Sequence, residues 1–143
     1  MDAQLLLADS AQVAPESGKV YALGLGWTAT VTPLPPQAVI ILVDVDWDET
    51  NVQHEAVVRL VDADGRPVTV SGPDGDHQIE VQARFESGRP PGWPPGAPLR
   101  VPLSFAMAPG LALAPGRYTW RLSIDGDDRA SWETSFLVNS QPA

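Results

Sequence analysis

Proline and glycine interrupt this chain so often that long helices are excluded. The 143 residues include 15 prolines and 12 glycines, and few windows between them can hold a helix of about ten residues. Between the breaks lie short runs in which apolar and polar residues alternate. A period of two is typical of half-buried strands, so the spacing of the breaks predicts an all-β fold.

The clearest alternation lies in two segments near the C-terminus. Residues 118–124 alternate large apolar side chains with polar ones, and residues 131–138 repeat the pattern. Between them, residues 125–128 read Asp-Gly-Asp-Asp, a turn sequence in which glycine supplies a positive φ and aspartate bonds its own backbone. The two segments therefore predict an antiparallel hairpin.

Shorter runs along the rest of the chain predict further strands. They are residues 5–7, 20–23, 38–43, 56–61, 68–70, 79–86 and 101–107. The runs 38–43 and 56–61 are apolar on both faces, which indicates central strands covered on two sides. Pro102 removes one ladder bond and places its strand at an edge or a bulge. About eight or nine strands at this spacing predict a β-sandwich or small barrel.

Residues 114–126 begin Ala-Pro-Gly-Arg-Tyr and continue as an alternating strand. They resemble the last hairpin of many bacterial immunoglobulin-like domains, in which a Pro-Gly-x-Tyr turn opens the penultimate strand. Further segments carry a second resemblance: residues 5–12, residues 18–21 with Gly26 and Trp27, residues 47–51 with His54, and residues 86–92. Together they resemble a family of small uncharacterised proteins from high-GC bacteria. The resemblances imply an immunoglobulin-like antiparallel β-sandwich with no catalytic residues to transfer, and the length of 143 residues predicts a single domain over residues 1–143.

Charge and composition argue against several classes of function. The chain has 18 acidic and 9 basic residues, a formal net charge of −9, and no cysteine. Disulfides, thiol catalysis and cysteine-ligated zinc are therefore excluded. The negative charge argues against nucleic acids and anionic membranes as partners. The first residues lack the basic segment of a secretory signal, so we expect a cytoplasmic protein.

Three aspartates give the sharpest candidate for a metal site. Asp44, Asp46 and Asp48 lie at alternate positions, so on a strand their side chains share one face, and Glu49 and His54 follow closely in the sequence. Clustered carboxylates suit Ca²⁺, which takes six to eight oxygen ligands. The alternative is that the strand leaves the core near Asp44 and the acids mark its solvated end. We favour that alternative, and we expect no cofactor.

Histidine and serine residues give weaker support for catalysis. His54 and His77 are the two histidines of the chain, and zinc held by histidine alone needs a third. The Gly-x-Ser-x-Gly motif of a nucleophile elbow is absent. A lone histidine beside carboxylates is more often a hydrogen-bonded structural residue. The sequence therefore predicts a protein that is not an enzyme.

A proline-rich loop at residues 89–98 contains the candidate binding residues Trp93 and Arg89. A large aromatic ring in a stiff loop loses little freedom on contact, which suits a binding surface. The other interpretation is that Trp93 covers an open end of the core, which we favour because rings of this size are largely buried on average. Trp27 follows two glycines and is either a third binding residue or a cap on one end of the fold.

These features favour a non-enzymatic interaction module that binds a protein partner. The acidic charge favours a partner with a basic patch, because opposite charges steer the two proteins together. One alternative is a phage- or particle-associated structural protein that forms homo-oligomers through exposed strand edges. Another is a carbohydrate- or calcium-binding sandwich, in which Trp93 or Trp27 stacks on a sugar ring.

Overall fold

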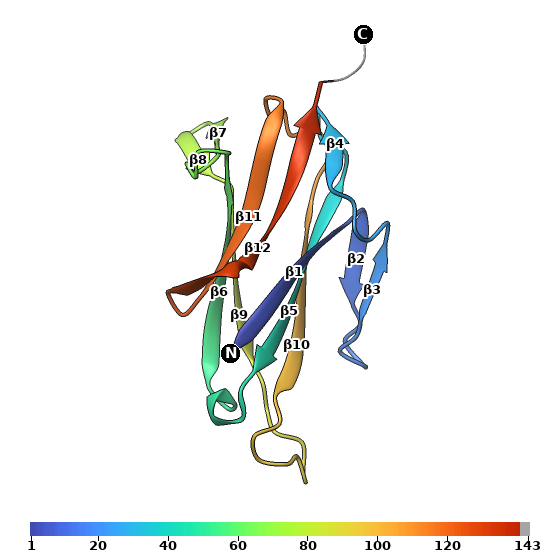
Figure 1. Cartoon of the computed structure of the whole chain (residues 1–143), viewed down its shortest axis with the longest axis vertical. Coiled ribbons are helices and arrows are strands. Elements are labelled where there is room, and N and C mark those ends of the chain that lie inside the picture. The colour runs from blue at the N-terminus through green and yellow to red at the C-terminus, as the bar shows by residue number, and fades with distance from the viewer. Residues whose placement is uncertain (141–143) are drawn as a thin grey trace.

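The computed structural model describes residues 1–140, which form twelve strands and one short 3-10 helix (Figure 1). The elements are β1 (Asp2–Ala8), β2 (Ser10–Val13), β3 (Val20–Leu23), β4 (Ala29–Val31), β5 (Gln37–Val45), η1 (Trp47–Glu49), β6 (Gln53–Val61), β7 (Thr69–Gly72), β8 (Gly75–Gln78), β9 (Glu80–Glu86), β10 (Leu99–Met107), β11 (Gly116–Ile124) and β12 (Asp127–Asn139). The all-β prediction is confirmed. The count of eight or nine strands was too low, because β2, β4 and β8 have three or four residues each and lack large alternating side chains.

Two larger sheets make up most of the structure. One has the strand order β1-β5-β10, and the other has the order β4-β12-β11-β6-β9. Both runs that are apolar on two faces became central strands, β5 and β6, and the strand that contains Pro102 lies at an edge, as predicted. The second sheet is not wholly antiparallel, because β4 pairs in parallel with the end of β12. The antiparallel prediction is therefore wrong for this pair.

One hydrophobic core takes side chains from both larger sheets. The hairpin predicted near the C-terminus is the antiparallel pair β11 and β12, and its inward side chains Trp120 and Phe136 are almost completely buried. Phe105 of β10 meets Trp120 of β11 edge to face, with ring centroids 5.3 Å apart. This contact joins the two sheets through their largest side chains.

The strands β2 and β3 form a separate two-stranded antiparallel ribbon beside the three-stranded sheet (Figure 1). Its cross-strand pairs sort the side chains into two faces. The inner face carries Ala11 opposite Ala22 and Val13 opposite Val20. Because β2 packs over β5 and β10, this face covers the side of β5 that points away from the main core. Accordingly, the β5 residue Ile40 is buried without belonging to that core.

Within residues 1–140, no helix is long and apolar enough to cross a membrane.

Candidate functional site

The outer face of the β2–β3 ribbon and the loop after it expose three large apolar side chains. Tyr21, Leu23 and Leu25 are 62%, 72% and 56% exposed, respectively. We refer to these three residues as the ribbon patch. Other large hydrophobic residues that are exposed among the described residues lie singly on separate elements. The ribbon is therefore the place where exposed apolar surface gathers.

Alternation along β3 explains why these side chains point to solvent. Val20 and Ala22 occupy the inner face of the ribbon, so Tyr21 and Leu23 must occupy the outer face, opposite Gln12 and Ser10. Gly24 follows the strand with φ +67°, and a Cβ at this position would collide with the Asp9 carboxylate. Glycine therefore allows the close approach that fixes the end of the ribbon.

A groove of about 440 Å³ lies between β3 and the outer face of the three-stranded sheet, and we refer to it as the ribbon groove. Its lining residues are Leu6, Gly18, Lys19, Val20, Ala22, Leu25, Ile40, Leu42, Arg100 and Pro102. Most of these side chains are apolar. The two charged ones differ, because Arg100 donates to both carboxylate oxygens of Asp44, at 2.8 and 3.0 Å, whereas Lys19 forms no ion pair within residues 1–140.

The proline-rich loop is a pair of tight turns that leaves Trp93 outside the core. The Trp93 N–H donates to the Pro90 carbonyl at 3.0 Å, and the Ala97 N–H donates to the Pro94 carbonyl at 3.2 Å. Gly92 and Gly96, with φ of +80° and +85°, occupy the positions that a type II turn reserves for glycine.

The Trp93 indole N–H donates within the same loop, to the Ala97 carbonyl at 2.9 Å. The ring is 37% exposed and takes no part in the core. The interpretation that Trp93 covers an open end of the core is therefore wrong. Local turn bonds hold the ring against its own loop instead.

The other two candidate binding residues make contacts inside the fold. The Arg89 guanidinium stacks on the Trp47 ring, with its central carbon 3.6 Å from the ring centroid, and its Nε donates to the Thr50 hydroxyl. Trp27 is half-buried and meets Phe136 edge to face, with centroids 5.5 Å apart. Arg89 thus fixes the base of the proline-rich loop, and Trp27 packs against one end of the core.

The three predicted metal ligands do not form one group. β5 ends at Val45, and Trp47–Glu49 turns as a 3-10 helix, so the alternation that would align Asp44, Asp46 and Asp48 stops before Asp46. Asp44 pairs with Arg100 on the neighbouring strand. Asp46 and Asp48 instead lie with Glu49, and one carboxylate oxygen from each lies within 4.8 Å of the others.

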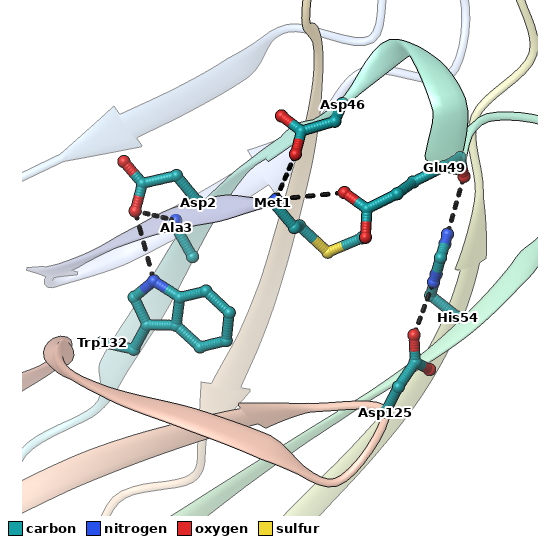
Figure 2. Close-up of polar contacts among 8 residues, drawn as sticks. All are labelled: Met1, Asp2, Ala3, Asp46, Glu49, His54, Asp125 and Trp132. Atoms are coloured by element: carbon teal, nitrogen blue, oxygen red, sulfur yellow. Dashed lines mark hydrogen bonds and ion pairs between the residues drawn. The ribbon is translucent and has the colours of Figure 1, made fainter.

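The N-terminal ammonium group already occupies part of this acidic cluster (Figure 2). The Met1 nitrogen donates to Asp46 Oδ2 at 2.6 Å and lies 3.0 Å from Glu49 Oε1. Burial would lower the pKa of this ammonium group, but the bonds to the two carboxylates raise it. The cluster therefore balances its negative charge with a cation from the chain itself.

His54 is a buried structural histidine that joins three segments of the chain. Its Nδ1 lies 2.6 Å from Asp125 Oδ2 and its Nε2 lies 2.8 Å from the Glu49 carbonyl (Figure 2). Both partners are acceptors, so the contacts suit an imidazolium that donates from both nitrogens. The other oxygen of Asp125, Oδ1, accepts from the Glu55 N–H at 2.9 Å. The ring thus connects η1, the start of β6 and the β11–β12 turn. His77, by contrast, lies exposed on β8.

Protonation of His54 is expected to make stability depend on pH. Burial would lower the pKa of His54, but the bonds to Glu49 and Asp125 outweigh it and raise the pKa above 6.5. The stabilisation by the charged ring is therefore complete below pH 6.5 and is lost as pH rises through the higher pKa of the folded state. Denaturant unfolding between about pH 6 and pH 9 measures this loss.

The variant Asp125→Asn isolates the charge, because asparagine retains an acceptor for the Glu55 N–H and also tolerates the positive φ of 52° at this position. It should lose stability less steeply than the wild type over this pH range. Equal slopes would contradict the imidazolium assignment. The contribution of the Met1 ammonium group, whose raised pKa also affects stability in this range, is common to both proteins and cancels.

Sequence reasoning missed the ribbon patch, although part of its signal was visible. Residues 20–23 were predicted as a strand, and the alternation of Val20 and Ala22 with Tyr21 and Leu23 is present in the sequence. The partner strand β2 is short and half polar, so the two-stranded ribbon was not expected. Without β2, nothing in the local pattern shows that the larger side chains are the ones that face solvent.

Comparison with known proteins gives a family and no function. No curated protein matches the chain. One family description, "Family of unknown function (DUF6941)", matches residues 4–138. This match covers most of the chain and includes both larger sheets, the ribbon and the acidic cluster. The chain therefore belongs to the family of unknown function DUF6941.

Proposed function

We propose that this protein is a non-enzymatic interaction module that binds another protein through the ribbon patch. The observation that carries the proposal is the exposure of Tyr21 and Leu23 on the outer face of β3, with Leu25 exposed in the loop that follows. Adjoining exposed apolar side chains on a soluble domain mark interaction surfaces. Tyrosine in particular supplies a large contact area at a low entropic cost.

The ribbon is held in place before any partner arrives. Its inner face covers the outer side of β5, where Ala38 and Ile40 are buried, and the Asp9 N–H donates to the Leu23 carbonyl at 2.9 Å. A surface that is already ordered loses little conformational entropy on binding. These contacts support a ribbon that acts as a fixed platform for the partner.

The net charge of the chain favours a partner whose surface is basic. At −9, the protein attracts such a partner over a distance and speeds their encounter, and salt screens this attraction. Association should therefore become slower as ionic strength rises.

A second candidate function is self-assembly of copies into a larger particle, through the same ribbon. It is favoured by β3, which pairs with β2 on one side and with no other strand of the described residues. Repulsion between copies that each carry −9 opposes it, and we rank it below the interaction with another protein. Light scattering over a range of concentrations separates the two, because only self-assembly raises the mass.

We further propose that the two larger sheets form an immunoglobulin-like sandwich. Support comes from the core shared by both sheets and from the start of β11. There the Tyr118 hydroxyl donates to the Ala114 carbonyl, four residues upstream, at 2.7 Å. A tyrosine that bonds back to the backbone in this way resembles the tyrosine corner of immunoglobulin-like domains.

The double substitution Tyr21→Ser with Leu23→Ser is expected to abolish partner capture without unfolding the protein. Both side chains lie on the solvent side of the ribbon, so their loss removes contact area and leaves the core intact. The measurement is affinity capture from a lysate of the native organism, with quantitative mass spectrometry, followed by titration of the purified partner. We expect an affinity loss of about 100-fold, as is common when central anchors are removed.

Leu137→Ser is the matched control, because Leu137 is 50% exposed on β12, a different sheet. It should retain the partner at wild-type levels. Retention of every captured protein by the double variant, or equal losses in both variants, would contradict the proposed function.

A further inference from the structure

The free edge of β3 lacks the proline and charge that protect edges of the larger sheets. Unpaired edges invite another strand to pair with them, and proteins usually block this with proline, charge or bulges. The edge strand β10 contains Pro102, and the edge strand β9 carries charged Glu80 and Arg84. Strand β1 packs against β12, and β4 has three residues. The β3 sequence Val-Tyr-Ala-Leu has none of these protections.

The ribbon groove lies against this same strand. Val20 and Ala22 of β3 line it, over a floor that includes Leu6, Ile40 and Leu42. Side chains of neighbouring strands point to the same face at matching positions. If another segment paired with β3, every second side chain of that segment would therefore point into the ribbon groove, as Val20 and Ala22 do. The groove volume of about 440 Å³ is within the range of ligand pockets.

The positive charge of Lys19 at the groove favours a bound segment that carries a carboxylate. Lys19 precedes β3 and is the single lysine of the chain. It forms no ion pair within the described residues, whereas Arg100, the other cation in the lining, is already bonded to Asp44. Although the chain has a net charge of −9, Lys19 places a positive charge at the groove. No carboxylate of the described residues lies within 4.0 Å of the Lys19 nitrogen, so a carboxylate that enters beside it can form an ion pair there.

We propose that the ribbon groove binds an extended segment of the partner protein, which pairs with the free edge of β3, directs alternate apolar side chains into the groove and places a carboxylate beside Lys19. This proposal rests on the proposed function and specifies how the ribbon binds. Backbone bonds to β3 supply affinity, and the groove supplies the preference for apolar residues at alternate positions. A partner with a basic surface can also supply this carboxylate, because the long-range attraction depends on its whole surface and the pairing with Lys19 depends on one residue.

Two synthetic peptides test the proposal on the chain of 143 residues. Each is a fluorescent peptide of about six residues, a typical strand length, with valine and threonine in alternation and an aspartate at either the first or the last position. Fluorescence anisotropy should show saturable binding, tighter for the peptide whose aspartate reaches Lys19. N-methylation of alternate backbone nitrogens removes strand pairing while it keeps the side chains, and it should weaken binding by at least about tenfold.

Variants of the protein locate the site. Leu42→Asn changes the groove floor and Lys19→Glu reverses the local charge, and each should weaken binding of the tighter peptide by about tenfold. Lys19→Glu should also remove the difference between the two peptides. Leu137→Ser should bind like the wild type. Thermal melting of each variant confirms that it is folded before binding is measured.

Three results would overturn strand addition. They are no binding of either peptide, equal binding of the N-methylated peptide, and wild-type binding by Leu42→Asn and Lys19→Glu. The proposed function fails separately, if the double substitution in the ribbon patch still captures the partner. Loss of capture together with indifference to N-methylation would leave the interaction module standing and reject this mode of binding.

Discussion

Replacing Trp120 with alanine is expected to lower the free energy of unfolding by about 3–5 kcal/mol, the range for large-to-small changes at buried aromatic residues. The Trp120 side chain is 0% exposed, and its ring meets Phe105 of the opposite sheet. Its removal leaves a cavity at the contact that joins the two sheets. Denaturant unfolding, followed by circular dichroism, measures the effect.

The matched control is Trp93→Ala, which removes the same side chain from the proline-rich loop. We expect a loss below about 1 kcal/mol, because the ring contacts its own loop and lies outside the core. Similar losses at both positions would show that Trp93 supports the fold and would contradict the assignment of the loop as peripheral. Partner capture by Trp93→Ala then shows whether the loop is a second contact.

Replacing His54 with alanine is expected to lower the free energy of unfolding by about 2–4 kcal/mol. The ring is buried and lies tilted against Phe85, with centroids 5.4 Å apart. Its loss leaves a cavity and removes the hydrogen bonds to the Glu49 carbonyl and to Asp125. The measurement is chemical unfolding at a pH below 6.5, where the charged ring contributes fully.

Two further variants separate the causes. His54→Phe restores ring packing without the hydrogen bonds, so it should recover part of the loss. His77→Ala removes an exposed histidine from β8 and should change stability by less than about 0.5 kcal/mol. A His54→Ala protein as stable as the wild type would show that the ring does not connect the three segments.

The strands that the sequence predicted well are those whose pattern is complete within one segment. In residues 118–124, large side chains alternate with polar ones over the whole strand, and the Asp-Gly turn that follows permits only a short connection. The inward face and the hairpin partner follow from that pattern alone. The strands β2, β4 and β8 have no such pattern, and they form where the larger sheets and the neighbouring strands place them.

The candidate metal site shows the limit of local patterns. Asp44, Asp46 and Asp48 share a face only if the strand continues, and it ends at Val45. The cation that balances Asp46 and Glu49 is the Met1 ammonium group, which comes from a distant part of the sequence. His54 was expected to be structural, but its partner Asp125 lies in the β11–β12 turn. Contacts between such distant segments depend on the fold and are not encoded in residue spacing.

The ribbon patch is an intermediate case. Alternation in residues 20–23 identifies two faces, but it does not show which face is covered. The ribbon packs on the sheet through β2, which contacts β5 and β10, and this packing turns Val20 and Ala22 toward the ribbon groove. The larger Tyr21 and Leu23 are therefore left outside. Hydrophobicity alone would have favoured the opposite arrangement.

The most direct test of the ribbon patch as a binding surface is the thiol-labelling rate of the variant Leu23→Cys. The chain has no cysteine of its own, so the label reports this position alone. We predict that the isolated protein reacts at the rate of a free thiol at every protein concentration, and that the captured partner protects the thiol when it is added at saturation. Slow labelling of the isolated protein, labelling that slows as concentration rises, or no protection by the partner would contradict the account.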